Sequence, residues 1–183
     1  MKFLYVCLSG VFLLVFSHSP TRASSSALTF LPMQGKTLSK ASVTLPDYFN
    51  KRLTLVAFGF SKDSQNAMDT WLIPFKARYR DDARTFYMEI PMIGPGYSWF
   101  RGFIEKGMRK GIPTPAHAHV MSYYQSLAPY LNYYGFDKKS EPHILLVGPD
   151  SHILFQAQGA ATASTLKDLF ERCQQQLSRL PMP

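Results

Sequence analysis

The sequence predicts an α/β fold: a central mixed sheet flanked by helices, with a helical insertion between the two halves of the chain. Residues 53–60 form an apolar run typical of a strand buried on both faces. From residue 67 the apolar residues take helical spacing, so a helix follows that strand directly. Near the other end, the runs 144–147 and 153–158 are separated by Gly-Pro-Asp-Ser, which is typical of a β-hairpin.

The N-terminal segment has the pattern of an export signal. A basic start is followed by the apolar segment 3–16 and by Thr-Arg-Ala at 21–23, a small-x-small cleavage site. The apolar segment is shorter than the roughly 20 residues that a spanning helix needs. We therefore predict a signal peptide over 1–23, a flexible leader over 24–30, and a periplasmic or extracellular mature protein. An uncleaved membrane anchor is the alternative.

The remaining chain is long enough for one domain, predicted over 31–180. Without Lys2 and Arg22, 18 of the 20 basic residues face 12 acidic ones, so the mature net charge is near +6. This charge favours anionic partners or surfaces, but an exported protein without a long basic run is not predicted to bind nucleic acid. Only Cys173 remains after cleavage, which excludes an intramolecular disulfide.

The first half of the domain combines turn and strand signals. Gly35-Lys36 suits a turn and 43–45 a short strand that Pro46 ends, after which Asp47 can cap one helical turn. The buried strand, the helix to about Tyr79 and a second strand over 85–90 follow.

Residues 93–119 are predicted to be the insertion. After a Gly-Pro-Gly loop, Ser98 can cap a helix over 99–110, which Gly102 and Gly107 weaken by roughly 1 kcal/mol each. One face of this helix is apolar, and packing of that face onto the sheet is the favoured interpretation. A basic amphipathic surface for a membrane or a partner is the alternative. The residues of this face are Trp99, Phe100, Phe103, Ile104 and Met108.

The second half begins with a strand over 120–124 and a tyrosine-rich helix over 125–134. The hairpin comes next, and Thr162 or Ser164 caps a final helix that carries Cys173 on its apolar stripe.

Two segments resemble thioredoxin-superfamily proteins: LTLVAFGF followed by a helix, and EPHILLVGPDSHILFQAQGAAT followed by the last helix. The resemblance implies a thioredoxin-like sheet with the insertion between its halves. A narrower resemblance is to the mitochondrial ATP synthase assembly factor family, which helps mature the membrane sector of that complex. It is carried by LPMQGKTL, LTLVAFGFS, WLIPF, GMRKGIP and the hairpin segment, and it implies an assembly or accessory role.

Alignment with a thioredoxin strand puts a degenerate loop where Cys-x-x-Cys would stand. This loop consists of Asp63, Ser64, Gln65 and Asn66, and Pro142 takes the place of the cis-proline. His143 is then expected to face the loop. Dithiol exchange needs a reactive thiolate and a resolving sulfur, neither of which the loop contains. Ser64 is interpreted as a helix cap because no base for a nucleophilic serine is identifiable.

The remaining candidates for chemistry are few. Cys173 is interpreted as a buried hydrophobic residue, since a reactive thiol would need exposure and nearby positive charge. His117 and His119 would share one face of a strand, but two ligands without a nearby cysteine or carboxylate do not predict a metal site. No cofactor is predicted.

We therefore predict a non-catalytic binding or assembly protein that acts on another protein, with a membrane surface as a further candidate contact. The predicted binding residues lie at the exposed edge of the insertion: Arg101, Arg109, Lys110, His117 and His119. The alternative is a divergent peroxiredoxin-like or thiol-reductase-like enzyme that uses Cys173.

Overall fold

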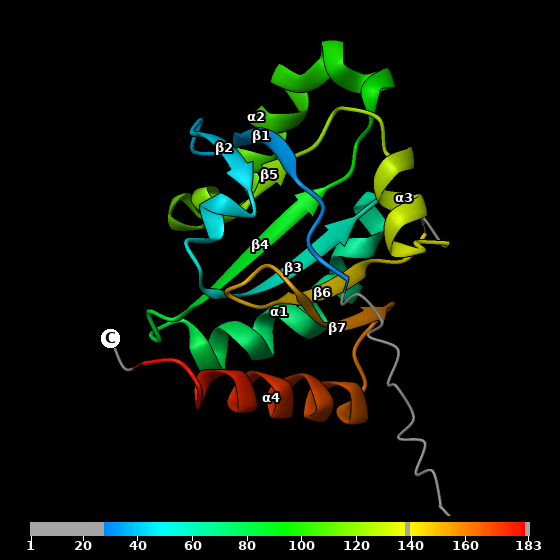
Figure 1. The fold of residues 1–183 in the computed structure, drawn as a ribbon. Coiled ribbons are helices and arrows are strands. Elements are labelled where there is room, and N and C mark those ends of the chain that lie inside the picture. Colours follow the sequence, from blue (N-terminus) through cyan, green and yellow to red (C-terminus); the bar gives the residue numbers. More distant parts are fainter. Residues whose placement is uncertain (1–27, 138–139, 182–183) are drawn as a thin grey trace, which may run out of the picture.

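Figure 1 shows the fold in a computed structural model, which describes residues 28–137 and 140–181. The predicted signal peptide and most of the predicted leader lie outside the described residues. No helix within the described ranges combines the length and apolar character that crossing a membrane requires.

The chain folds into strands, α-helices and short 3-10 helices. In order, the elements are β1 (Met33–Thr37), β2 (Ser42–Leu45), η1 (Asp47–Phe49), β3 (Leu53–Gly59), η2 (Lys62–Ser64), α1 (Gln65–Tyr79), β4 (Thr85–Pro91), η3 (Pro95–Phe100), α2 (Arg101–Gly111), η4 (Thr114–His119), β5 (Met121–Ser122), α3 (Ala128–Tyr134), β6 (His143–Val147), β7 (Ile153–Gln158) and α4 (Ala163–Leu177), where η marks a 3-10 helix.

The central sheet is mixed, as predicted, with strand order β4-β3-β6-β7. β3 pairs in parallel with β4 and antiparallel with β6, and β6 and β7 form the predicted hairpin. All seven residues of β3 are buried. The apolar run at 53–60 therefore identified one of the two interior strands correctly.

Two helices cover one face of this sheet. α1 and α4 pack side by side beneath it (Figure 1), and both contribute to one apolar cluster with the inner residues of β3 and β6. Trp71 of α1 is fully buried there, and its indole Nε1 donates to the carbonyl of Gly159 at 2.8 Å. Full burial of an aromatic side chain contributes roughly 1.5–3 kcal/mol, so α1 is anchored to the sheet beside the hairpin.

The opposite face is covered by a second, smaller sheet and by α3. The small sheet has the order β2-β1-β5, and its apolar residues join those of β3, β4 and β6 in a second cluster. Phe30 packs on Phe49, Phe58 and Tyr134 with ring centroids 5.2–6.3 Å apart. The segment before β1 is thereby fixed to the core.

The structure corrects several expected boundaries. Gly35-Lys36 lies inside β1 rather than in a turn. The strand expected over 120–124 is only β5, and it pairs with β1 of the small sheet. The helix expected over 99–110 starts at Arg101, after a 3-10 helix in which Ser98 makes no cap hydrogen bond. In these segments, glycine and polar residues interrupt the apolar spacing from which a strand or a helix is recognised in the sequence.

The ends of the other elements agree better with the sequence. Thr162 caps α4, accepting from the backbone N–H of Thr165, whose side chain accepts from the N–H of Thr162 in return. This capping box satisfies two of the amide groups that a helix start leaves free. Asp47 begins the expected single turn, but without a side-chain cap bond.

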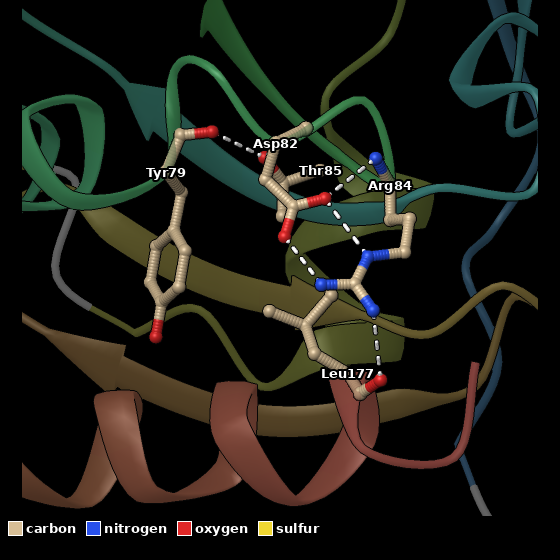
Figure 2. Close-up of polar contacts among 5 residues, drawn as sticks. All are labelled: Tyr79, Asp82, Arg84, Thr85 and Leu177. Atoms are coloured by element: carbon tan, nitrogen blue, oxygen red, sulfur yellow. Dashed lines mark hydrogen bonds and ion pairs between the residues drawn. The ribbon is translucent and has the colours of Figure 1, made fainter. Parts of the chain in front are cut away.

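Figure 2 shows a polar clamp that joins the C-terminal ends of α1 and α4. The Arg84 guanidinium and backbone N–H donate to the Asp82 carboxylate at 2.7–3.0 Å, and Arg84 Nη1 donates to the Leu177 carbonyl at 3.2 Å. The Thr85 hydroxyl donates to the Tyr79 carbonyl at 2.8 Å. These bonds satisfy carbonyl groups that helix ends leave without partners.

Replacing Asp82 with Asn should therefore lower the free energy of unfolding at pH 7. Hydrogen bonding from Arg84 lowers the pKa of the Asp82 carboxyl, so its contribution is present above the unfolded-state pKa of about 4 and is lost as the pH falls. Urea unfolding at pH 7 and pH 3 should show the wild type and the variant converging in acid. Asp81→Asn, at a 90% exposed side chain, is the control, and an equal effect of the two variants would contradict the assignment.

Candidate functional site

The degenerate loop follows the C-terminal end of β3 and forms η2 and the start of α1. Ser64 is buried, and its hydroxyl donates to the Ser61 carbonyl at 2.7 Å. Ser64 does occupy the position before α1, but it makes no cap bond to the helix amides, contrary to the sequence interpretation. Gln65 Nε2 donates to Asp69 Oδ1 at 3.0 Å. These side chains hold the local backbone and present no activated nucleophile.

Pro142 directly precedes β6, and His143 is the first residue of that strand. The cis peptide bond among the described residues is Leu45–Pro46, so the bond before Pro142 is trans. The His143 ring is buried and packs against Phe136 and Phe60, with ring centroids 4.1 and 5.7 Å away. These aromatic contacts help to fix the ring at the start of β6.

Cys173 is buried in the core between α4 and the sheet, as predicted. Burial raises the pKa of its thiol to about 12. The neighbouring Arg172 points elsewhere, with its guanidinium donating to Asp168 and to the Leu154 carbonyl. A thiol of this kind holds almost no thiolate at neutral pH, and thiolate is the nucleophile in disulfide and peroxide chemistry.

Alkylation of native protein at pH 7.5 should consequently leave Cys173 unmodified on the time scale in which a free cysteine reacts completely. With a pKa of about 12, the thiolate fraction is about 10³-fold or more below that of an unperturbed cysteine. Mass spectrometry of the peptide that contains Cys173 measures the rate. Urea should restore rapid modification, and rapid modification without urea would contradict the buried assignment.

The five predicted binding residues of the insertion differ in exposure. Lys110 is exposed and Arg101 is half-exposed. His117 is buried, with Nε2 2.9 Å from the Ile112 carbonyl oxygen, and His119 stacks on Tyr87 with centroids 4.2 Å apart. Burial lowers the pKa of His119. The expectation that all five lie at an exposed edge is wrong for His117, which is buried, while His119 is half-buried.

Arg109 is also structural. Its Nε donates to the Leu38 carbonyl at 2.9 Å, and its Nη2 donates to Glu105 at 2.9 Å. Glu105 is itself buried. The bond to Leu38 ties α2 to the loop between β1 and β2, and the bond to Glu105 within α2 holds the Arg109 side chain in place. No group of three or more potential metal ligands occurs within the described ranges.

Replacing Arg109 with Ala should therefore reduce stability by about 1–3 kcal/mol, because Glu105 loses its short hydrogen bond inside a mostly buried site. Lys110→Ala, a neighbouring loss of the same charge from an exposed position, should stay within about 0.5 kcal/mol. Urea unfolding measures both variants. If they behave alike, Arg109 is not the tether of α2.

The most exposed apolar residues of the insertion are aromatic. Tyr97, Trp99, Phe100 and Phe103, here named the aromatic tip, are 58%, 77%, 43% and 79% exposed. Trp99 and Phe100 contact each other with centroids 3.7 Å apart, and η3 and α2 project from the body beyond β5 (Figure 1). The favoured interpretation, packing of this face onto the sheet, is therefore wrong for Trp99, Phe100 and Phe103.

Comparisons with solved structures identify the fold. No protein-family model and no curated protein matches the chain. Among solved structures, BsSco, of the Sco family of cytochrome c oxidase assembly proteins, is 11% identical with a TM-score of 0.58, over 85% of this chain and 96% of that one. A thiol-disulfide oxidoreductase of Bacteroides fragilis is 12% identical with a TM-score of 0.54, over 79% and 98%.

The thioredoxin domain of a thiol-disulfide oxidoreductase of Bacteroides vulgatus is 18% identical, with a TM-score of 0.51 over 82% of this chain and 99% of that one. These likenesses confirm the predicted thioredoxin-like fold. They do not extend to the narrower resemblance with ATP synthase assembly factors.

Proposed function

We propose that this protein is an exported, non-catalytic binding protein of thioredoxin-like fold that serves as an accessory or assembly factor for another protein. The exposed aromatic tip carries the proposal. Two of its side chains, Trp99 and Phe103, are more than three-quarters exposed, although large aromatic side chains gain free energy by leaving water. Trp and Tyr are also enriched among the residues that dominate binding energy at protein interfaces.

The charges around the aromatic tip indicate the surface chemistry that a partner would need. Arg101, Lys106 and Lys110 lie along α2, while its one acidic residue, Glu105, is buried against Arg109. The surface is therefore an apolar centre with a basic margin. A complementary partner is a protein surface with an apolar hollow bordered by Asp or Glu, because opposite charges steer association and oppose wrong partners.

The absence of a usable thiol in the described chain supports binding over catalysis. The degenerate loop holds Asp63-Ser64-Gln65-Asn66, and Cys173 is buried away from it in the core. Several structural neighbours are named as thiol-disulfide oxidoreductases, so a redox enzyme that uses Cys173 is the competing function. That enzyme would need Cys173 to reach solvent, which requires α4 to separate from the sheet.

A double variant, Trp99→Ser with Phe103→Ser, tests the proposal. Partners captured from the membrane and soluble fractions are identified and purified, and their affinities for wild type and variant are compared at low salt. We expect the variant to bind roughly 10–100-fold more weakly, as loss of two central aromatic contacts does. Its melting temperature should not fall, since both side chains are exposed.

Ile73→Ser is the control, because Ile73 is 60% exposed but lies on α1; it should leave the affinity unchanged. Unchanged affinity in the double variant would overturn the assignment of the tip as the docking surface. Binding of wild type, but not of the double variant, to phosphatidylglycerol vesicles without any protein partner would replace the proposed partner with a membrane.

A further inference from the structure

A polar groove lies between the small sheet and the start of α2. It has a volume of about 370 Å³, within the range of small-ligand sites. The lining comes from all three strands of the small sheet, from the start of α2 and from the segment after β5: Gln34, Gly35, Lys36, Ser42, Val43, Thr44, Arg101, Ser122, Tyr124 and Gln125. The side chains that line the groove are mainly cationic or hydrogen-bonding rather than apolar.

Two polar atoms of this lining are poorly satisfied. The Tyr124 hydroxyl and Arg101 Nε are both buried, and neither forms a well-aligned hydrogen bond with another described residue, although the Ser122 side chain lies close enough to the Tyr124 hydroxyl to interact with it. Tyr124 as a whole is 4% exposed. An unsatisfied buried polar group costs about 1–3 kcal/mol, so two neighbouring ones mark a place where a ligand can supply the missing hydrogen bonds.

The two atoms belong to one arrangement. The Arg101 guanidinium carbon lies 4.4 Å from the centre of the Tyr124 ring, so the cation is held against the aromatic face. Glu105 Oε1 is 3.8 Å from Arg101 Nε, too far for a hydrogen bond, while Oε2 is engaged by Arg109 at 2.9 Å. Arg101 is thus positioned by its neighbours without being neutralised by a short ion pair.

We propose that this groove binds a carboxylate, held by Arg101 and Lys36 with a hydrogen bond from the Tyr124 hydroxyl. Arginine matches the planar, two-oxygen geometry of a carboxylate. No described residue forms an ion pair with Lys36, which leaves its ammonium group for a ligand. The carboxylate of Glu105 near Arg101 reduces the local positive charge, which favours a singly charged group over a phosphate dianion.

The carboxylate can belong to a free dicarboxylic acid or to an acidic side chain of a polypeptide. Glutarate and an end-capped tetrapeptide of glutamate are the two probes, and inorganic phosphate is the comparison. Two-dimensional amide spectra of the purified protein should show shifts on titration with at least one carboxylate probe, centred on Gly35, Ser122 and Tyr124. The probe that binds identifies the source, and phosphate should bind more weakly.

Variants assign the contacts. Arg101→Gln should weaken binding about tenfold or more, the scale of a lost charge-assisted hydrogen bond, whereas Arg80→Gln, the same charge loss at a distant 74% exposed side chain, should not. Tyr124→Phe should weaken binding several-fold with little change in the melting temperature of the free protein, because it removes only a poorly satisfied hydroxyl. This second variant keeps the fold and the charge intact.

The proposal is independent of the aromatic tip and would survive if the tip bound no protein. It is overturned if neither carboxylate probe shifts the groove amides, if phosphate binds more tightly than both, or if Tyr124→Phe binds as well as the wild type. Equal losses in Arg101→Gln and Arg80→Gln would likewise assign the binding to net charge rather than to this groove.

Discussion

The burial of β3 on both faces is the constraint on which the rest of this structure depends. All seven of its residues are buried, and each face gains its stabilisation only if a separate layer covers it. α1 and α4 cover one face, and the small sheet with α3 covers the other. The loop after β3, which aligns with the Cys-x-x-Cys position through the resemblance to thioredoxin-superfamily proteins, is consequently held in position whether or not it carries chemistry.

The segment that follows β4 is less constrained by packing than the central sheet. The 93–119 segment leaves the central sheet after Pro91 and returns beside β4, with bridges that join Val120 to Glu89 and Tyr123 to Met92. Between these points α2 is attached to the body by the hydrogen bond from Arg109 to the Leu38 carbonyl and by the contact of Arg101 with the Tyr124 ring. The aromatic tip is therefore presented on a short, tethered projection, and the groove opens where the projection meets the small sheet.

Sequence periodicity predicted β3, α1, the hairpin and α4 because each buries a continuous apolar run or stripe against the rest of the domain, so the apolar spacing reports the contact directly. It failed at the insertion because an apolar stripe on a helix shows only that one face avoids water. The stripe does not show whether the sheet or a partner covers that face. The roles of Glu105, Arg109 and His119 depend on Leu38 and Tyr87, which are distant in sequence, so no local pattern could predict them. The groove likewise joins segments far apart in the chain.

The central claim is that this thioredoxin-like fold acts by binding and not by thiol chemistry. Its most direct test is the rate at which the purified protein, supplied with dithiothreitol, reduces the disulfide bonds of insulin. The buried, protonated thiol of Cys173 leads us to expect the same rate as with dithiothreitol alone, both for the wild type and for Cys173→Ala. An acceleration by the wild type that disappears in Cys173→Ala would contradict the claim.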